Sequence, residues 1–426
     1  MTIASPVLST DQWASETREG FPFFNEAGTE PLIYFDNGAT TQKPRRVIDA
    51  ISTFYETANS NVGRGVYRLS MQAGELYEGA RATVASFIGV SDPKYLIFTK
   101  NTTDSINLVA SSFGDLVVAA GDEVVITGME HHSNLLPWRM LCERREARLI
   151  VVPTAPQGRV SLKDFERVLT PRVKMVAVAH VSNVLGTVNP VAEIIELAHR
   201  QGIPVLVDGA QAVSRRRVDV QELDADFYAM SAHKMYGPLG VGALYVKPEH
   251  LQRMPAVHLG GGTAKGVSYD GELELMPLPN RFEPGTPNIA GALGMAAAAD
   301  FLTDLGMDRV SSHDAEIVIS AAERLQAIEN VRVLGDPTGL PGGMVSFVVD
   351  GLHPYDVGNH LNSHGIAVRT GVHCAIPFVD SLSLVGTVRA SFGVYNTGSE
   401  VDQMIEAMST VKAGMWTTEH PTRRFL

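Results

Sequence analysis

The middle of the chain alternates short apolar, largely β-branched runs with longer segments in which apolar residues recur at helical spacing. The short runs predict buried strands at Tyr95–Thr99, Glu123–Thr127, Leu149–Val152, Lys174–Ala179 and Ile203–Asp208. The segments between them predict helices at Asp104–Phe113, Leu135–Arg145, Leu162–Leu169 and Ala192–Gln201. Alternating strands and helices form βαβ units, so we expect an α/β fold with a mainly parallel sheet in a three-layer αβα domain.

The pattern changes after this alternation. The run Phe227–Val246 predicts a strand, a glycine-rich turn and a second strand. Two long helical patterns follow it, at Ala290–Leu305 and His313–Ile328. They mark the passage to a C-terminal part with a different organisation.

The C-terminal part mixes the two periodicities. It predicts strands at Gly343–Val349 and Ile366–Arg369 and helices at Tyr355–Ser363 and Glu400–Val411. Such a mixture is typical of a smaller α+β unit. We therefore expect a large domain over residues 31–295 and a small domain made of residues 1–30 and 296–426.

Composition narrows the class of protein. Hydrophobic residues make up 45% and charged residues 19% of the 426, which suits a folded chain with a large core. The 35 basic and 47 acidic residues give a net charge of −12, which disfavours binding to nucleic acid or an anionic membrane. The polar N-terminal segment lacks a signal-peptide pattern, and two cysteines are too few for a disulfide framework. We expect a cytoplasmic protein.

Polar residues cluster directly after the predicted strands. They form the groups Asn101–Thr103, Glu130–His132, Ser182–Asn183 and Asp208–Gln211. Open α/β sheets bind ligands beyond the carboxyl ends of their strands, so these groups predict a binding site at that edge.

Lys234 follows an apolar strand and is the first candidate for chemistry. A lysine there is either solvated at the strand end or held in a desolvated pocket, where its amine becomes a Schiff-base nucleophile. Asp208 also ends a predicted strand, which places a carboxylate at the same sheet edge. A cofactor of the pyridoxal type needs such a carboxylate to keep its pyridine nitrogen protonated.

Several motifs share a resemblance. They are VDGAQA, MSAHKMYGPLGVGALY, MEHHSNLLPW, HVSNVLGT, RFEPGTPNIAG and AVRTGVHC followed by VRASFGVYNT. From about Tyr34 to about Val411 the chain resembles the class V, fold-type I pyridoxal-phosphate enzymes. Within them it is similar to the Suf-type branch of cysteine desulfurases and selenocysteine lyases. The resemblance implies a fold-type I transferase with pyridoxal 5′-phosphate as cofactor.

The resemblance also implies roles for individual residues. Lys234 would bind the cofactor and move protons, and His131 would stack on its ring. The other cofactor-binding residues would be Asp208, Asn183, Gln211, Thr103, Ser231, His233 and Thr286. Thr286 is similar to a position that reaches the phosphate site of the neighbouring subunit, which implies a homodimer. Taken alone, Thr103 is as well explained as a helix cap, and His131 as a surface histidine.

Substrate and reaction follow from three further residues. Arg389 matches the family's carboxylate-binding arginine, with Arg369 and Asn183 in the same pocket, and a guanidinium suits the carboxylate of an amino acid. Cys374 matches the family's persulfide-forming cysteine, although a lone cysteine is more often a small core residue. The implied activity converts L-cysteine to L-alanine and passes sulfur through Cys374 to an acceptor protein or thiol, as in iron–sulfur cluster assembly.

Three positions depart from the family pattern and keep alternatives open. Gly63, Tyr67 and Val372 stand where the family commonly carries histidines. The alternative is a lyase for selenocysteine, cysteine sulfinate or a cysteine S-conjugate. A non-catalytic assembly partner and an ordinary transaminase are further readings, which intact Lys234 and the Cys374 loop oppose. No spacing of Cys and His residues fits a metal site.

Overall fold

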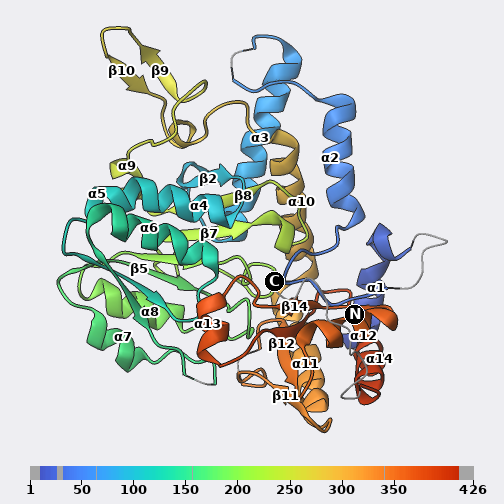
Figure 1. Ribbon diagram of the computed structural model, residues 1–426. Helices are drawn as coiled ribbons and strands as arrows, with labels where there is room; N and C mark the ends of the chain where they lie inside the picture. The colour runs from blue at the N-terminus through green and yellow to red at the C-terminus, as the bar shows by residue number, and fades with distance from the viewer. Residues whose placement is uncertain (1–9, 26–31, 64, 156, 340, 412–426) are drawn as a thin grey trace, which may run out of the picture.

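The computed structural model describes residues 10–25, 32–63, 65–155, 157–339 and 341–411. Its centre is a seven-stranded sheet with the strand order β2-β8-β7-β6-β5-β3-β4 (Figure 1). The strands are β2 (Leu96–Thr99), β3 (Glu123–Thr127), β4 (Arg148–Val152), β5 (Val173–Ala179), β6 (Val205–Asp208), β7 (Phe227–Ser231) and β8 (Gly242–Val246). All neighbouring strands are parallel except at β8, which is antiparallel to both β2 and β7.

Helices cover both faces of this sheet because successive strand residues point to opposite sides. Val124 and Ile126 pack with one group of helices: α4 (Thr102–Val109), α6 (Leu136–Arg145) and α9 (Pro248–Arg253). Val125 packs with the other group: α3 (Arg68–Phe87), α7 (Leu162–Val168), α8 (Val191–His199) and α10 (Ile289–Leu305). The predicted three-layer α/β fold is confirmed.

A second unit follows α10. Its sheet has the order β11-β12-β15-β14, all antiparallel. The strands are β11 (Val331–Val333), β12 (Met344–Val349), β14 (Arg369–Gly371) and β15 (Thr387–Ser391). The helices of this part are α11 (Met307–Gln326), α12 (Pro354–Ser363), α13 (Ile376–Ser381) and α14 (Gly398–Ser409). A separate apolar core joins α11, α12 and α14 to this sheet.

The N-terminal part contacts this second unit. Arg18 of α1 (Thr10–Glu19) pairs with Glu400 of α14, and Trp13 lies edge-on to His313 of α11. Strand β1 (Ile33–Tyr34) pairs in parallel with β13 (Ile366–Ala367). Residues 33–34 of the chain therefore contact the second unit through a strand pairing. The predicted domain boundaries stay a prediction.

Several element boundaries differ from the predicted ones. The single strand expected at Ile366–Arg369 is divided into β13 and β14, which belong to different sheets. Helix α11 begins at Met307, before the predicted start at His313. The helix expected to end at Phe113 passes from α4 through a π-helical turn at Ala110–Gly114 into α5 (Asp115–Val117). The periodicity alone does not reveal such a widened turn, because it keeps the chain helical.

Helices α2 (Arg45–Thr57) and α3 and a β-hairpin were not predicted. Helices α2 and α3 pack on α10, and a hairpin of β9 (Ala264–Val267) and β10 (Leu273–Leu275) projects from the body of the molecule (Figure 1).

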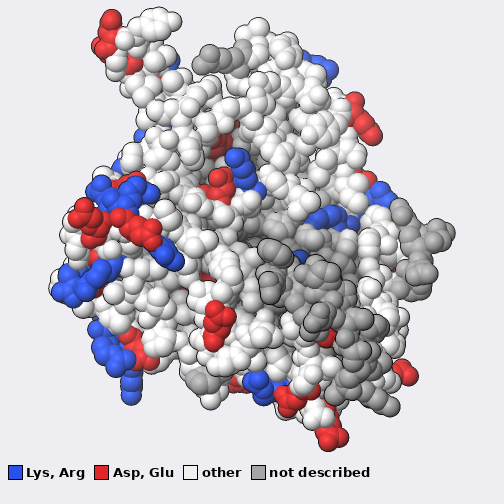
Figure 2. Space-filling model, in the orientation of Figure 1, with Lys and Arg blue, Asp and Glu red and all other residues white. Residues whose placement is uncertain are grey.

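Over the edge that carries α5 and α6, acidic and basic side chains lie side by side (Figure 2), as in the pair Arg144–Asp115. No single described helix is long and apolar enough to cross a membrane; only α10 and α11 together, bent by 79°, pass by length and composition.

Candidate active site

A cavity of about 300 Å³ lies at the carboxyl ends of the central strands, where they meet the second unit. It brings together residues from eight separate stretches of the chain. All but one of the predicted site residues line it: Thr103, His131, Asn183, Asp208, Gln211, Ser231, His233, Lys234, Arg369, Cys374 and Arg389. Only Thr286 lies elsewhere.

Lys234 ends a short 3-10 turn, Ala232–Lys234, directly after β7. Burial of its ammonium group lowers its pKa to about 8, and the nearby Asp208 carboxylate opposes this shift. A substantial fraction of the amine is therefore neutral near physiological pH, as a nucleophile or base requires. The backbone is held in place because the His233 carbonyl accepts hydrogen bonds from Thr41 N (3.0 Å) and Lys43 Nζ (3.1 Å).

Asp208 is the last residue of β6 and is buried. Burial raises its pKa, while the N–H of Ala210, which donates to Oδ1 at 2.9 Å, and Lys234 favour the charged form. The next residue must be glycine, because a Cβ on Gly209 would lie 2.1 Å from the ring of Tyr228. The close packing of Gly209 on Tyr228 holds the Asp208 carboxylate in the lining of the cavity.

His131 lies in the loop after β3. Its Nδ1 accepts a 3.0 Å hydrogen bond from the N–H of Ser133, so that nitrogen carries no proton. Burial lowers the pKa of His131 to about 3, and Lys234 contributes to the shift. The ring is therefore neutral, and it lines the cavity, which suits stacking on an aromatic ligand. Beneath it, the buried Glu130 accepts a 2.7 Å hydrogen bond from Asn134 and fixes the loop.

One end of the cavity is built from hydroxyl and N–H groups. The N–H and the hydroxyl of Thr102, at the start of α4, both lie 2.7 Å from Ser231 Oγ. Thr103 Oγ1 is 2.7 Å from Ser133 Oγ. The buried Nδ1 of His233 has no hydrogen-bond partner among the described residues. A helix N-terminus lined with hydroxyl groups, beside an imidazole nitrogen without a partner among the described residues, fits a phosphate group.

Thr102 is a lining residue that the sequence analysis missed. The two threonines of Asn101–Thr103 are equivalent as letters, and only the structure shows that Thr102 is the buried one beside Ser231. The close approach of this segment to β7 depends on Gly242. A Cβ there would lie 2.5 Å from the Met230 carbonyl oxygen and 2.7 Å from Asn101 Cα.

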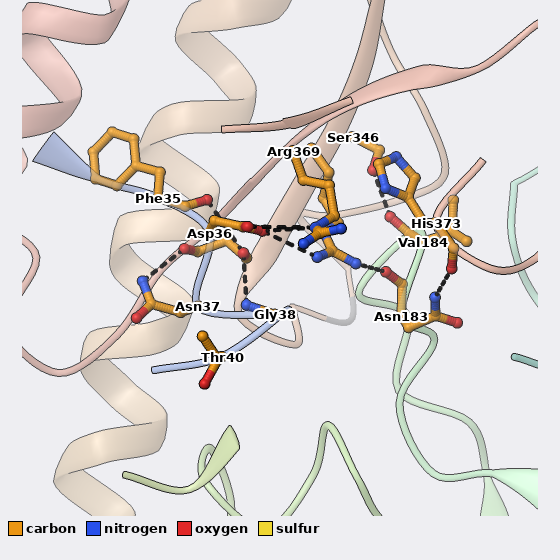
Figure 3. Close-up of polar contacts among 12 residues, drawn as sticks. Phe35, Asp36, Asn37, Gly38, Thr40, Asn183, Val184, Ser346, Arg369 and His373 are labelled. Carbon is orange, nitrogen blue, oxygen red and sulfur yellow. Dashed lines mark hydrogen bonds and ion pairs between the residues drawn. The ribbon is translucent and has the colours of Figure 1, made fainter. Parts of the chain in front are cut away.

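The opposite end of the cavity carries the two arginines. Arg389 is buried, and its Nη1 donates a 2.6 Å hydrogen bond to the Asn183 carbonyl. Burial lowers its pKa to about 10, so it stays protonated at neutral pH, and Asp36 supports the charge. The Asp36 carboxylate also lies 3.2 Å from Arg369 Nε (Figure 3). A guanidinium held in this way can bind a carboxylate inside the cavity.

Cys374 lies at the rim of the cavity and is exposed. Its φ of 55° and that of His373, 51°, are in the left-handed region, so two consecutive residues form a sharp turn. The turn is anchored because Asn183 Nδ2 donates to the His373 carbonyl (Figure 3) and His132 N donates to the Cys374 carbonyl, both at 2.7 Å. Cys142, in contrast, is buried in α6, and burial raises its pKa to about 11.

Thr286 and two of the departures from the family pattern line a second cavity of about 760 Å³. Gly63 and Tyr67 contribute to its wall, and Thr286 is exposed. Within one chain, these three residues are therefore separate from Lys234. Val372, the third departure, packs partly buried against the main apolar core.

Among the described residues, no group of three His, Cys, Asp or Glu side chains comes together to hold a metal ion.

The aminotransferase class-V family model matches residues 33–404. The chain belongs to this family. A probable cysteine desulfurase of Halalkalibacterium halodurans is 45% identical over 94% of this chain and 98% of that protein. The apo structure of a cysteine desulfurase from Thermococcus onnurineus NA1 aligns with a TM-score of 0.89 and 40% identity, covering 96% of this chain and 98% of that one. The Escherichia coli cysteine desulfurase CsdA, in an S-sulfonic acid form, aligns with a TM-score of 0.86 and 35% identity over 93% and 97%.

These likenesses confirm the predicted family, the fold-type I architecture, the pyridoxal phosphate cofactor and the assignment as a cysteine desulfurase. Membership of the Suf-type branch is compatible with them and stays a prediction. The roles of individual residues also stay predictions.

Proposed function

We propose that the chain removes sulfur from L-cysteine, releases L-alanine and carries the sulfur as a persulfide on Cys374. The supporting observation is that one cavity holds a half-buried lysine with a lowered pKa, a buried arginine and an exposed cysteine at its rim. These are the groups needed to move a proton, bind an α-carboxylate and accept sulfur.

Pyridoxal phosphate would be held along the length of the cavity. Its phosphate would lie among Thr102, Thr103, Ser231 and His233, its ring against His131, its pyridine nitrogen at Asp208 and its phenolic oxygen at Asn183 and Gln211. When bound, it supplies an electron sink for the bonds broken at the substrate Cα. Asn183 and Gln211 each give one amide hydrogen to a backbone carbonyl, of His373 and Gly38, and each keeps a second donor.

Lys234 and Arg389 would act on the amino acid itself. Arg389 binds the α-carboxylate through its fork of N–H groups, one of which is already oriented by the Asn183 carbonyl. Arg369 lies at the same end of the cavity and adds positive charge. Lys234, whose amine is partly neutral, takes the proton from the substrate Cα and returns a proton later in the cycle.

Cys374 would receive the sulfur. Its thiolate attacks the sulfur of L-cysteine, so that an S–S bond forms and the Cβ–S bond breaks. The electron pair of the broken bond stays on the three-carbon fragment, which takes up a proton at Cβ and leaves as L-alanine. The persulfide then sits at the exposed rim, where a thiol of an acceptor can reach it.

Three wider features belong to the same proposal. The acceptor is a protein or small thiol in sulfur supply for iron–sulfur clusters, the protein acts in the cytoplasm, and it works as a homodimer in which Thr286 reaches the partner's phosphate site. The exposure of Thr286 beside a second, larger cavity supports the dimer. The competing activity is that of a lyase for selenocysteine, cysteine sulfinate or a cysteine S-conjugate, with pocket changes at Gly63, Tyr67 and Val372.

The test compares two cysteine variants of the holoenzyme. Alanine and sulfide formed from L-cysteine, with a reducing thiol as acceptor, are measured for Cys374→Ala and for Cys142→Ala as the matched control. The proposal predicts loss of at least about 100-fold in Cys374→Ala, because no other thiol lies at the rim, and near-normal rates in Cys142→Ala. Undiminished alanine formation in Cys374→Ala would favour the lyase.

A further inference from the structure

His132 is the second histidine of the EHH segment, and none of the roles proposed for the main cavity falls to it. It lies in the loop between β3 and α6 and opens a 3-10 turn, His132–Asn134. The described lining of the main cavity includes the preceding His131 but not His132. The contacts of His132 lie instead on the turn that carries Cys374.

Two hydrogen bonds join His132 to this turn. The His132 N–H donates to the Cys374 carbonyl at 2.7 Å, and the ring Nε2 accepts a 3.1 Å hydrogen bond from the Ile376 N–H. Ile376 is the first residue of α13, and the residue before it, Ala375, provides no side-chain cap. The first N–H groups of a helix have no partner within the helix. The His132 ring therefore caps α13 from a distant part of the chain.

The ring can act as this cap only while Nε2 carries no proton. Burial lowers the pKa of His132, which favours the neutral ring at physiological pH. A neutral imidazole has a single N–H, so an accepting Nε2 places that proton on Nδ1. The ring in this form is an acceptor toward α13.

The Cys374 turn depends on contacts of this kind. His373 and Cys374 both have left-handed φ values, a conformation that residues other than glycine keep only when their surroundings enforce it. Asn183 holds the His373 carbonyl (Figure 3), while His132 holds the next carbonyl and the start of α13. Because the Cys374 side chain is exposed, its backbone largely determines where the thiol lies.

We propose that His132 is a positioning residue for sulfur transfer, which fixes the Cys374 turn so that the thiol lies in reach of an amino acid bound in the cavity. The inference rests on the proposed function and adds a residue to it. His131 and His132 are consecutive, so the ring expected to stack on the cofactor and the residue that holds the thiol belong to one segment. His132 acts through the turn and not on the reacting atoms.

Three substitutions separate the acceptor of the ring from its bulk. His132→Gln carries an amide oxygen at about the reach of Nε2, His132→Asn ends one carbon shorter, and His132→Leu has no acceptor. His132 is half-buried, so the polar pair Gln and Asn keeps the test decisive if the Leu variant does not fold. The matched control is His353→Leu, which removes a similar cap from α12, where His353 Nδ1 accepts from the Tyr355 N–H at 3.2 Å.

The first measurement is amide hydrogen exchange of the holoenzyme without substrate, followed by mass spectrometry on peptides that cover residues 372–380. Loss of one hydrogen bond is expected to speed exchange there about fivefold in His132→Asn and His132→Leu. His132→Gln and the His353→Leu control should exchange like the wild type in this segment. Unchanged exchange in both the Asn and the Leu variant overturns the proposal.

The second measurement separates sulfur transfer from binding of the amino acid. In His132→Asn and His132→Leu the single-turnover mass gain of about 32 Da from L-cysteine should form about tenfold more slowly. The dissociation constant of L-alanine, followed by the visible absorbance of the bound cofactor, should change less than twofold, because L-alanine has no sulfur to present to the thiol. His132→Gln should restore the rate.

A merely structural role for His132 predicts a different pattern. It would weaken L-alanine binding as much as it slows the mass gain, and that result contradicts the proposal. A His132→Gln variant as slow as His132→Leu contradicts the role of the ring acceptor.

The two measurements also distinguish this inference from the proposed function. If the wild type gains no mass while exchange shifts as expected, the proposed function fails and the hold of His132 on the turn stands. If the wild type gains the mass and the Asn and Leu variants gain it equally fast, the proposed function stands and the inference fails.

Discussion

Arg215 Nη1 donates a 2.7 Å hydrogen bond to Asp314 Oδ1, and both side chains are almost fully buried. Arg215 follows β6 in the large unit, whereas Asp314 lies on α11 in the second unit. The same Nη1 also donates, at 3.1 Å, to the carbonyl of Phe392, which is close in sequence to Arg389. This ion pair therefore ties the end of the central sheet that carries Asp208 to the strand that carries Arg389.

Breaking that pair on one side is predicted to destabilise the protein strongly. Asp314→Ala leaves the Arg215 charge buried without a carboxylate, so we expect the free energy of unfolding to fall by about 3 kcal/mol. Chemical denaturation followed by circular dichroism measures this. Asp402→Ala is the control, because Asp402 pairs with Arg324 but is 65% exposed, and a change below about 1 kcal/mol is expected. Equal effects of the two substitutions would contradict the assigned role of Arg215.

The pKa of Lys234 predicts how cofactor binding depends on pH. Only the neutral amine attacks an aldehyde, and burial lowers the pKa of this lysine to about 8. The rate at which cofactor-free protein develops the visible absorbance of bound pyridoxal phosphate should thus rise with pH and level off above about pH 8. Stopped-flow absorbance across the pH range measures it. A rate that still rises steeply at pH 10, as for a solvated lysine, would rule out the desolvated site.

Gly242 is predicted to control cofactor affinity without touching the reacting groups. Gly242→Ala places a methyl group against the backbone of Met230 and Asn101 and so displaces the start of α4 from Ser231. Overpacking of this kind costs about 1–3 kcal/mol, which corresponds to a dissociation constant for pyridoxal phosphate raised roughly 5- to 150-fold. Fluorescence titration of cofactor-free protein measures the constant. Gly79→Ala on α3, where an added Cβ meets nothing within 4 Å, should leave it unchanged.

The sequence predicts the central sheet well because its strands are short apolar runs bounded by polar residues. Asp208 ends one such run and Lys234 lies in the short turn after another. Because β6 and β7 are parallel neighbours, both residues lie at the same sheet edge, as expected. The helix and strand boundaries were less accurate where tertiary packing decides them, as in the split between β13 and β14.

Asp36 shows what the sequence could not reveal. Its link to Arg389 depends on a β-bridge with Ser391, a residue far away in the chain. No local periodicity records such a pairing. Thr102 escaped notice for a related reason, since its burial beside Ser231 depends on how α4 packs against β7 and β8.

The most direct test of the account is the intact mass of the holoenzyme after a single turnover with L-cysteine and no acceptor thiol. A gain of about 32 Da per chain, one sulfur atom, is predicted, with one alanine formed per site. The gain should be absent in Cys374→Ala, present in Cys142→Ala and reversed by a reducing thiol. Formation of alanine and sulfide with no mass gain in the wild type would contradict the sulfur-carrying role of Cys374.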